Sequence, residues 1–478
     1  MADYRSIPGP SPSRGGDSVA NVLHFSSDPL EYMSRARRKY GDVTALVRGG
    51  NDSLYVHNPD CPGTIFAFGP RQNEKILREA DTFHSASLIA SLLPRGSEAL
   101  RRITTGLFSY NGAEHRRQRQ LVWPPFHRKS VEAFCRVTGE VVENFIGGWK
   151  PETVVDVELE MKRLVLQVVW KTFFGVDSSS VPELAALTEE WLKRLLNLGK
   201  TWSPNLPGSP LHRICEEAEI IEQEIRKIIQ APDSGGPPRS VLSLLKASRD
   251  EQGEGLSEEE LVGHGFSMLM AGYETTANAV TWSLFLLVNH PAVLSDLHEE
   301  LQGHLGGEAP PAERMGRLSL LDLTVKESLR ILPPASLGWR IAARETGLGE
   351  YEIPAGTEVI YSPFHTHHSP ELYREPECFR PGRWEHLRPS PYEYLPFSAG
   401  PRMCLGASFA TQTIKVILSL LVQRFRFEIP PGTRVDYELG ITLFPKQGLP
   451  LRLRKQDSRF AEGKREVTGT IRKLVKLC

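Results

Sequence analysis

Apolar residues recur along most of the chain at helical spacing, three or four positions apart, with polar residues between them. This periodicity predicts amphipathic or buried helices at 28–41, 153–175, 182–199, 256–291, 292–307, 320–332 and 407–425. Gly41 and Gly175 stand where the first two of these helices would end, as glycine often does at a helix C-terminus. The pattern favours a mainly α fold class.

The longest apolar segment, 256–291, predicts a helix that runs through the middle of the protein. It opens with Ser257 and Glu260, which have the spacing of a helix-capping box. It then stays apolar for about eight helical turns. Because Glu274 and His264 interrupt it, the segment does not have the character of a membrane span.

Strand signals are fewer and come later in the chain. β-forming residues beside turn residues predict strands within 351–363 and 449–456, and the Pro- and Gly-rich segment 231–240 predicts a loop. We therefore expect a mainly α protein with a small β-rich lobe. Its expected divisions are a flexible Pro/Ser/Gly-rich N-terminus at 1–20, a single domain at 21–454 and a basic, solvated C-terminal tail at 455–478.

Composition narrows the class of protein. Of 478 residues, 40% are hydrophobic and 24% are charged, and the formal net charge of −1 gives no general attraction to nucleic acid or to an anionic membrane. No run of about 20 apolar residues occurs, so we expect no membrane span and a cytoplasmic location. The six cysteines are far apart and form no Cys-x-x-Cys pair, which argues against a zinc knuckle and a dithiol redox motif.

The stretch "FSAGPRMCLG" gives one cysteine a distinctive setting. Cys404 could be a core thiol, a nucleophile or a metal ligand. Gly400 and Gly406 allow the backbone to approach a flat group, Phe397 can pack on its face, and Arg402 supplies a fixed cation. A helix predicted to begin just after Cys404 favours the thiolate. Together these features point to an axial ligand of haem iron.

This pattern, Phe-x-x-Gly-x-Arg-x-Cys-x-Gly, resembles the haem-binding motif of the cytochrome P-450 family of haem-thiolate monooxygenases. Its five specified residues would match by chance on the order of once in a million windows. The resemblance extends over nearly the whole chain. It implies the cytochrome P-450 fold, with haem b between the long central helix and the Cys404 loop.

The stretch "ESLR" places Glu327 and Arg330 on one face of a helix. Such spacing usually gives an exposed ion pair. Here "FRPGRW" follows downstream and resembles the family's second arginine motif, with Arg383 in the matching position. The resemblance implies a buried network of Glu327, Arg330 and Arg383 that supports the haem loop.

The stretch "AGYETT" resembles the family's oxygen-activation segment. Ala271 and Thr275 lie four residues apart and share a helix face. Ala271 leaves room above a flat ring, and Gly272 can loosen the helix. Glu274 and Thr275 pair an acid with a hydroxyl, and the resemblance implies that both deliver protons during cleavage of O2.

Several cationic residues match family positions near the haem propionates. Arg119 suits a carboxylate because its guanidinium can bind both oxygens. The other candidates are His115, Arg340, Arg402 and His367, and His368 departs from the family's usual arginine. The nearby Arg116, Arg117, Arg128 and Lys129 predict a solvated basic face that could receive an acidic electron carrier.

Family position marks the expected substrate pocket, which is mostly apolar and favours an apolar substrate such as a fatty acid or terpenoid. Steroids and polyketide rings would also fit. The expected lining consists of Leu88, Ile89, Leu92, Leu93, Leu107, Met268, Leu269, Ala335, Ser336, Leu337, Ile441, Thr442 and Leu443.

These features predict insertion of one oxygen atom from O2 into an unactivated C–H bond. Since no Gly-rich flavin fingerprint is present, we expect electrons from a ferredoxin or flavodoxin with its reductase. One alternative keeps the haem in a peroxide-driven peroxygenase or an isomerase, although such relatives usually lose the acid–hydroxyl pair. A more distant alternative is a haem-free hydrolase with Cys404 as nucleophile, which no histidine motif supports.

Overall fold

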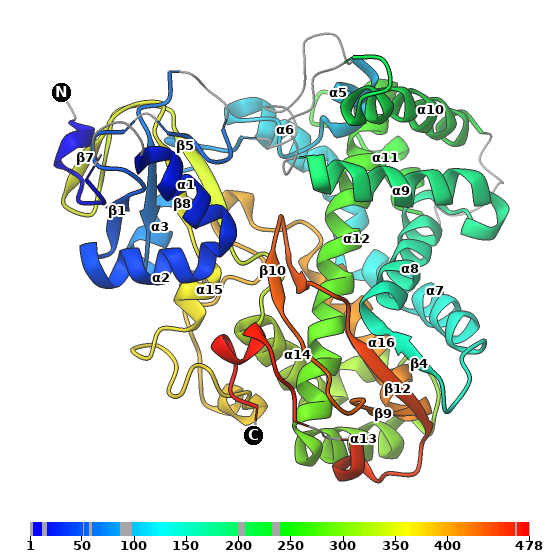
Figure 1. Cartoon of the computed structure of the whole chain (residues 1–478). Helices are drawn as coiled ribbons and strands as arrows, with labels where there is room; N and C mark the ends of the chain where they lie inside the picture. The colour runs from blue at the N-terminus through cyan, green and yellow to red at the C-terminus, as the bar shows by residue number, and fades with distance from the viewer. Residues whose placement is uncertain are drawn as a thin grey trace.

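One long helix, α12 (Glu258–Asn289), crosses the helical part of the protein in the computed structural model (Figure 1). The structure describes residues 3–11, 17–50, 52–56, 60–86, 98–198, 206–231, 240–463 and 466–477. The predicted capping box starts α12, because Ser257 N donates to Glu260 Oε2 and Glu260 N donates to Ser257 Oγ. The helix is apolar on most sides because neighbouring helices surround it.

The helices that pack directly on α12 include α5 (Glu98–Thr104), α8 (Val157–Val169), α14 (Ser319–Ile331) and α16 (Ala407–Arg424). Leu, Ile, Val and Phe side chains of these elements form the main core. The other α-helices among the described residues are α1 (Asp17–Ser27), α2 (Pro29–Tyr40), α3 (Pro70–Arg78), α6 (Gly112–Val122), α7 (Arg128–Ile146), α9 (Pro182–Leu198), α10 (Pro210–Gln230), α11 (Val241–Ala247), α13 (Pro291–Leu305) and α15 (Pro363–His367).

The β-rich lobe lies to one side of the helical body, with α1, α2 and α3 beside its strands (Figure 1). Its sheet has the order β1-β2-β8-β5-β3, in which only β2 and β8 are parallel. These strands are β1 (Val43–Ala45), β2 (Thr64–Ala67), β3 (Phe83–His84), β5 (Gly338–Ala342) and β8 (Glu358–Tyr361). The hairpin of β6 (Thr346–Leu348) and β7 (Tyr351–Ile353) is separate.

Two further small sheets belong to the helical side. One has the order β4-β12-β9, and the other is the hairpin β10–β11. Their strands are β4 (Val154–Asp156), β9 (Phe425–Glu428), β10 (Tyr437–Leu439), β11 (Leu443–Pro445) and β12 (Pro450–Lys455). The turn of the β10–β11 hairpin is important for the site described below.

The prediction of a helix at 153–175 is wrong at the N-terminal end of this segment. Val154–Asp156 forms strand β4, which pairs with β12, and α8 begins only after Asp156, whose side chain accepts from the backbone of Glu158. The helix ends in a π-turn, Trp170–Phe174, and Gly175 has the expected left-handed conformation. Pairing with a distant strand overrides the local helical pattern at Val154 and Val155.

Described parts of both chain ends carry buried side chains, within the segments 1–20 and 455–478 that the sequence predicted to be flexible and solvated. Near the N-terminus, Tyr4 and Ile7 are buried against the β-rich lobe. Near the C-terminus, four apolar side chains of the described segment 466–477 join the main core: Val467, Ile471, Leu474 and Val475. These side chains are spread among basic residues, so composition alone gave the wrong impression.

Among the described residues, every helix is by itself too short or too polar to cross a bilayer. Taken together, α12 and α13 have the length and apolar composition of a membrane span, but the pair is bent by 111°. The loop predicted at 231–240 falls mostly on residues 232–239, which lie outside the described residues.

Candidate functional site

The Cys404 loop joins the β-rich lobe to helix α16. Gly400 has φ +70°, and a Cβ there would collide with the carbonyl oxygen of Leu77, so the loop needs glycine at this position. The backbone N–H of Cys404 donates to Phe397 O at 2.8 Å, which closes the loop. By contrast, Gly406 has φ −85°, and a Cβ there would contact only Phe126 at 3.9 Å. The backbone conformation therefore explains Gly400 but not Gly406.

The Cys404 thiol lies close to groups that favour its ionised form. Burial raises the pKa of the thiol, and the Gly406 N–H and the Arg119 guanidinium offset only part of this rise. The residue nevertheless keeps accessible surface.

Three of the predicted cations, Arg119, Arg340 and Arg402, gather beside His115. Arg119 Nη2 donates to Met403 O at 2.9 Å, and this contact joins the cluster to the Cys404 loop. Burial, then Arg402 and Arg119, lowers the pKa of His115 to about 4. Burial, then Arg340 and Arg119, lowers the pKa of Arg402 to about 10. The cluster is thus destabilised by its own positive charge.

The arginine cluster contains a hydrogen-bond donor that has no acceptor in the protein. Arg402 Nη2 donates to Tyr110 O and Asn111 Oδ1, but its Nε is buried without an acceptor. Arg340 Nη1 donates to the carbonyl of Trp339. No ion pair between a described carboxylate and Arg119, Arg340 or Arg402 occurs within 4.0 Å. Such a set of donors is suited to an anionic ligand.

Helix α12 presents a partly exposed stripe in the middle of a buried segment. Between Leu261 and Asn289, partial exposure occurs at Met268, Met270, Ala271, Gly272 and Thr275. All except Met270 follow the spacing i, i+3, i+4, i+7 and so share one face. A Cβ on Gly272 would touch Phe173 and Val169 at 3.7–3.9 Å, and α12 remains helical there. The expected loosening of the helix at Gly272 is therefore not observed.

The acid and the hydroxyl of the "AGYETT" segment point to different neighbours. Thr275 Oγ1 donates to Ala271 O at 2.6 Å. The Glu274 carboxylate is buried and lies 3.7 Å from Lys162 Nζ of α8. Burial raises the pKa of Glu274, and Lys162 and a hydrogen bond from Thr442 offset this effect. Lys162 and Thr442 are partners that the sequence analysis missed, since only the packing of α8 and the β10–β11 turn on α12 brings them there.

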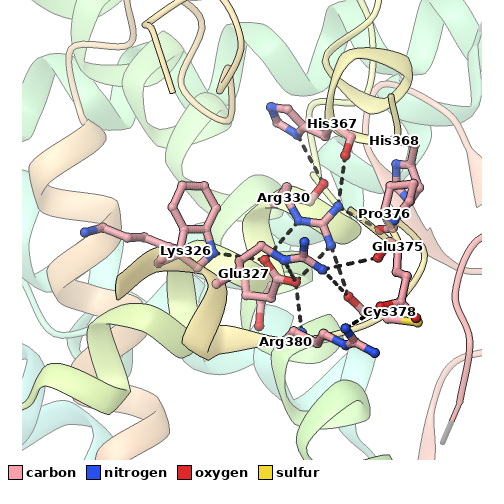
Figure 2. A network of polar contacts seen from close by, with 12 residues as sticks. Lys326, Glu327, Arg330, His367, His368, Glu375, Pro376, Cys378 and Arg380 are labelled. Atoms are coloured by element: carbon pink, nitrogen blue, oxygen red, sulfur yellow. Dashed lines mark hydrogen bonds and ion pairs between the residues drawn. The ribbon is translucent and has the colours of Figure 1, made fainter. Parts of the chain in front are cut away.

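The predicted network of Glu327, Arg330 and Arg383 forms beside the segment that follows α15 (Figure 2). Arg330 Nε and Nη2 donate to the two Glu327 oxygens at 2.9 Å, and Arg383 Nε donates to Glu327 Oε1 at 2.8 Å. Glu327 and Arg330 have no exposed side-chain surface. Trp384 Nε1 also donates to Glu327, a contact that the tryptophan in "FRPGRW" could have suggested.

His367 does not belong to the cationic cluster, which corrects its predicted contact with the haem edge. Its Nδ1 bonds to Arg330 O at 3.1 Å, and its Nε2 accepts from Leu395 N at 2.7 Å. Both ring nitrogens are thereby used within the protein. The imidazole instead holds α15 to α14 and to the segment before Cys404.

The sequence model of the cytochrome P450 family matches residues 10–448. The chain belongs to the cytochrome P-450 family. It is 32% identical over 418 residues to the cyclooctat-9-en-7-ol 5-monooxygenase of Streptomyces melanosporofaciens, covering 85% of this chain and 86% of that protein. It is 31% identical over 452 residues to cyclooctatin synthase of the same organism, covering 91% and 94%.

The fold of this cytochrome P-450 agrees with that of solved relatives. It superposes on the retinoic-acid-bound cyanobacterial CYP120A1 with a TM-score of 0.80 at 23% identity, covering 95% of this chain and all of the other. The predicted fold class is confirmed. The chain is an oxidoreductase of the P-450 monooxygenase class, and membership of the family implies a haem cofactor.

The residues present fit a haem. An exposed cysteine would suit the iron, a stripe of small or apolar positions on α12 the flat face, and an arginine cluster without described carboxylate partners the propionates of that cofactor. The buried Nε of Arg402 is the most telling of these features, because it lacks the acceptor that a propionate would supply.

The predicted lining of the substrate pocket divides into three groups. Leu88, Ile89, Leu92 and Leu93 lie outside the described residues. The positions that keep accessible surface are Leu107, Met268, Ala335, Leu337 and Ile441. The positions that are buried in protein contacts, and so do not lend surface to a ligand here, are Leu269, Ser336, Thr442 and Leu443.

The predicted basic face is largely neutralised by nearby carboxylates. Arg116 pairs with Asp81, and Arg128 pairs with Glu132. Arg117 is only partly exposed, and its Nε lies 3.0 Å from the Asp250 carboxylate. These pairs reduce the positive field that an acidic carrier would meet.

Proposed function

We propose that the chain binds haem b with Cys404 as the axial ligand and hydroxylates or epoxidises an apolar small molecule. The observation that carries this proposal is the contact of Arg119 with Met403, which joins the cationic cluster to the residue before Cys404. One small region thereby offers a thiolate for iron and donors for propionates. Arg119, Arg340, Arg402 and His115 are the proposed propionate residues, and Phe397, Gly400, Gly406 and Ala271 border the ring.

When bound, the haem supplies the redox chemistry by which O2 is activated, and thiolate ligation favours cleavage of the O–O bond. The reaction consumes O2, two electrons and two protons, and it yields the oxidised product and water. The protein must therefore deliver protons to the partly exposed face of α12. Thr275 lies on that face and can donate its hydroxyl proton there once it releases Ala271 O.

Glu274 is the proposed source of these protons. Its raised pKa keeps a larger fraction of the carboxyl protonated than in an exposed glutamate. The carboxyl starts on the side of α12 that faces Lys162, so it must turn toward Thr275 to act. Glu327, Arg330 and Arg383 support the structure and take no part in the chemistry.

The substrate class follows from the accessible lining. Leu107, Met268, Leu337 and Ile441 are apolar, so area of contact rather than ion pairing would hold the substrate. The names of the two relatives fit a terpenoid or a similar apolar alcohol, and fatty acids, steroids or polyketide rings remain to be tested. Electrons would come from a ferredoxin or flavodoxin with its reductase.

The test is the absorption spectrum of the ferrous protein with carbon monoxide, for the wild type, Cys404→Ser and Cys215→Ser. Cys215 is a partly buried cysteine on α10 and serves as the matched control. We expect a strongly red-shifted Soret band in the wild type and in Cys215→Ser, and its loss in Cys404→Ser. A band at the shorter wavelength of histidine or neutral-thiol ligation in the wild type would overturn the assignment.

Turnover of candidate substrates then tests the reaction itself. We expect oxygenated product with a ferredoxin or flavodoxin, its reductase, NAD(P)H and O2. Product formed with hydrogen peroxide but never with the electron-transfer proteins would support a peroxygenase instead.

A further inference from the structure

Asn111 stands at the start of α6 but does not cap this helix with its side chain. Asparagine in this position usually accepts a hydrogen bond from the first turn, as Asp28 and Ser257 do at the starts of α2 and α12. At Asn111 only the backbone carbonyl serves the helix, by accepting from His115 N. The next residue, Gly112, has φ +57°, a left-handed conformation that glycine adopts readily. The side chain of Asn111 is therefore available for contacts outside α6.

The Asn111 amide joins two other segments of the chain. Ser85 N, just after β3, donates to Asn111 Oδ1 at 2.9 Å, and Asn111 Nδ2 donates to Ser85 O at 3.1 Å. Arg402 Nη2 donates to the same Oδ1. Because a backbone N–H and a guanidinium only donate and a carbonyl only accepts, reversal of the amide would break all three bonds. Asn111 thus holds Arg402 at a fixed place relative to the end of β3.

The oxygens that hold Arg402 are uncharged. Its Nη2 donates to Tyr110 O at 2.6 Å and to the amide oxygen of Asn111, while its Nε is buried without an acceptor. Asp81 is the carboxylate whose charge acts on Arg402 from further away, and it is paired with Arg116 at 3.3 Å. A partly buried arginine is usually paired with a carboxylate, which cancels its charge. Here the guanidinium is held in place while its charge is not cancelled.

We propose that Asn111 is a positioning residue that holds Arg402 by a neutral oxygen, so that the charge of Arg402 remains available to a haem propionate. The inference deepens the proposed function and rests on Arg402 as a propionate residue. A carboxylate at position 111 would hold the guanidinium but would cancel its charge. An apolar side chain would let the guanidinium move away from the like charges of Arg119 and Arg340. The asparagine amide avoids both effects.

The first test is the rate of haem transfer from the purified holoprotein to an excess of apomyoglobin. We expect transfer about ten times faster from Asn111→Ala and from Asn111→Asp, which corresponds to one hydrogen bond to a charged group. Asn144→Asp is the charge-matched control. It adds the same charge at an exposed position of α7, next to the Glu143–Arg424 pair at the opposite end of α16 from Cys404. Transfer from Asn111→Ala at the wild-type rate would overturn the proposal.

The second test asks whether Asn111 acts through Arg402. We expect the double variant with Asn111→Ala and Arg402→Ala to lose haem at the rate of Arg402→Ala alone, because the amide then has no guanidinium to hold. Effects of the two substitutions that simply multiply would show that Asn111 acts independently of Arg402, and this result would overturn the proposal.

The third test separates the charge of residue 111 from its shape by the midpoint potential of the haem iron. A negative charge near the iron favours the ferric state, so we expect a more negative potential in Asn111→Asp than in the wild type or Asn111→Ala. Asn144→Asp should have the wild-type potential. Equal potentials in the two Asn111 variants would overturn the role of the neutral oxygen. If the aspartate variant does not fold, the alanine variant and the double variant still test the hold on Arg402.

These outcomes are distinct from failure of the proposed function. A carbon monoxide band at the shorter wavelength in the wild type would remove Cys404 as the ligand. It would not alter the comparison of haem transfer between Asn111 variants, since membership of the family implies haem. Wild-type haem retention in Asn111→Ala would overturn the role of Asn111 and leave the Cys404 assignment unchanged.

Discussion

Glu327 and Arg330 lie three residues apart on α14 and are joined by two hydrogen bonds of 2.9 Å, with no exposed surface on either side chain. A pair with the same spacing, Glu224 and Lys227 on α10, is exposed on the protein surface. The spacing of the two residues in the sequence therefore does not distinguish a buried pair from a surface pair. The surroundings decide the energy, because removal of one member of a buried pair leaves the other charged and without a partner.

Replacement of Glu327 should strongly destabilise the protein. Glu327→Ala leaves Arg330 and Arg383 without their shared carboxylate, and we expect a loss of about 3–5 kcal/mol in the free energy of unfolding. Glu224→Ala is the matched control, with an expected loss of about 0–1 kcal/mol. Denaturant unfolding followed by circular dichroism measures both. Equal small losses in the two variants would contradict the importance of the buried network.

Removal of Arg402 should weaken the retention of haem. Its buried Nε lacks an acceptor, and its charge is close to those of Arg119 and Arg340, so an anionic ligand would satisfy both conditions. We expect Arg402→Ala to lose haem faster to an excess of apomyoglobin. Arg116→Ala, which removes an exposed arginine paired with Asp81, should behave like the wild type. Haem loss from Arg402→Ala at the wild-type rate would argue against a propionate contact.

Loss of the Thr275 hydroxyl should uncouple electron consumption from product formation. Because a positioned proton donor contributes about 10²–10⁴-fold, we expect Thr275→Ala to form product at least about a hundred times more slowly. NAD(P)H consumption should continue, with hydrogen peroxide or water as the product. The ratio of product to NAD(P)H measures the effect, with Thr281→Val as the control for loss of a buried hydroxyl on the same helix. An unchanged ratio would remove Thr275 from the proton path.

The packing of the C-terminal segment 466–477 should depend on Asp436. Thr470 N and Arg434 Nε donate to its carboxylate at 2.8 and 2.7 Å. Arg434, and then the Thr470 N–H, lower the pKa of Asp436 to about 2. We expect Asp436→Asn to speed hydrogen exchange in 466–477, and little change in α14.

The pH dependence of this contribution has a definite sign. A lowered carboxyl pKa means that the folded state favours the ionised form. The stabilisation from Asp436 is therefore complete above the ordinary pKa of 3.8 and is lost as the pH falls toward about 2. The difference in stability between the wild type and Asp436→Asn should shrink over that range. A difference that stays constant on acidification would show that the charge of Asp436 is not responsible.

Periodicity along the chain was enough to predict α12 with its capping box. The residue types in two short motifs were enough to identify Cys404 and Glu327 as candidate site residues. These signals are local: a helix is specified by residues three and four apart, and the Cys404 motif by residue types within positions 397–406. Val154 shows the limit of this reasoning, because its pairing with β12 lies almost 300 residues away in the chain.

Only the tertiary structure decided which partners the polar side chains take. His367 and Thr442 occupy the sequence positions expected for a haem contact and a pocket lining. Backbone groups instead bond to both ring nitrogens of His367, and the Asn278 side chain donates to the Thr442 hydroxyl. The sequence determined the fold class, the family and the thiol, because these depend on short patterns of residue type. The direction of Glu274, the packed C-terminal segment and the arginine cluster depend on elements that meet only after folding, since a buried polar group bonds to whatever the packing brings within reach.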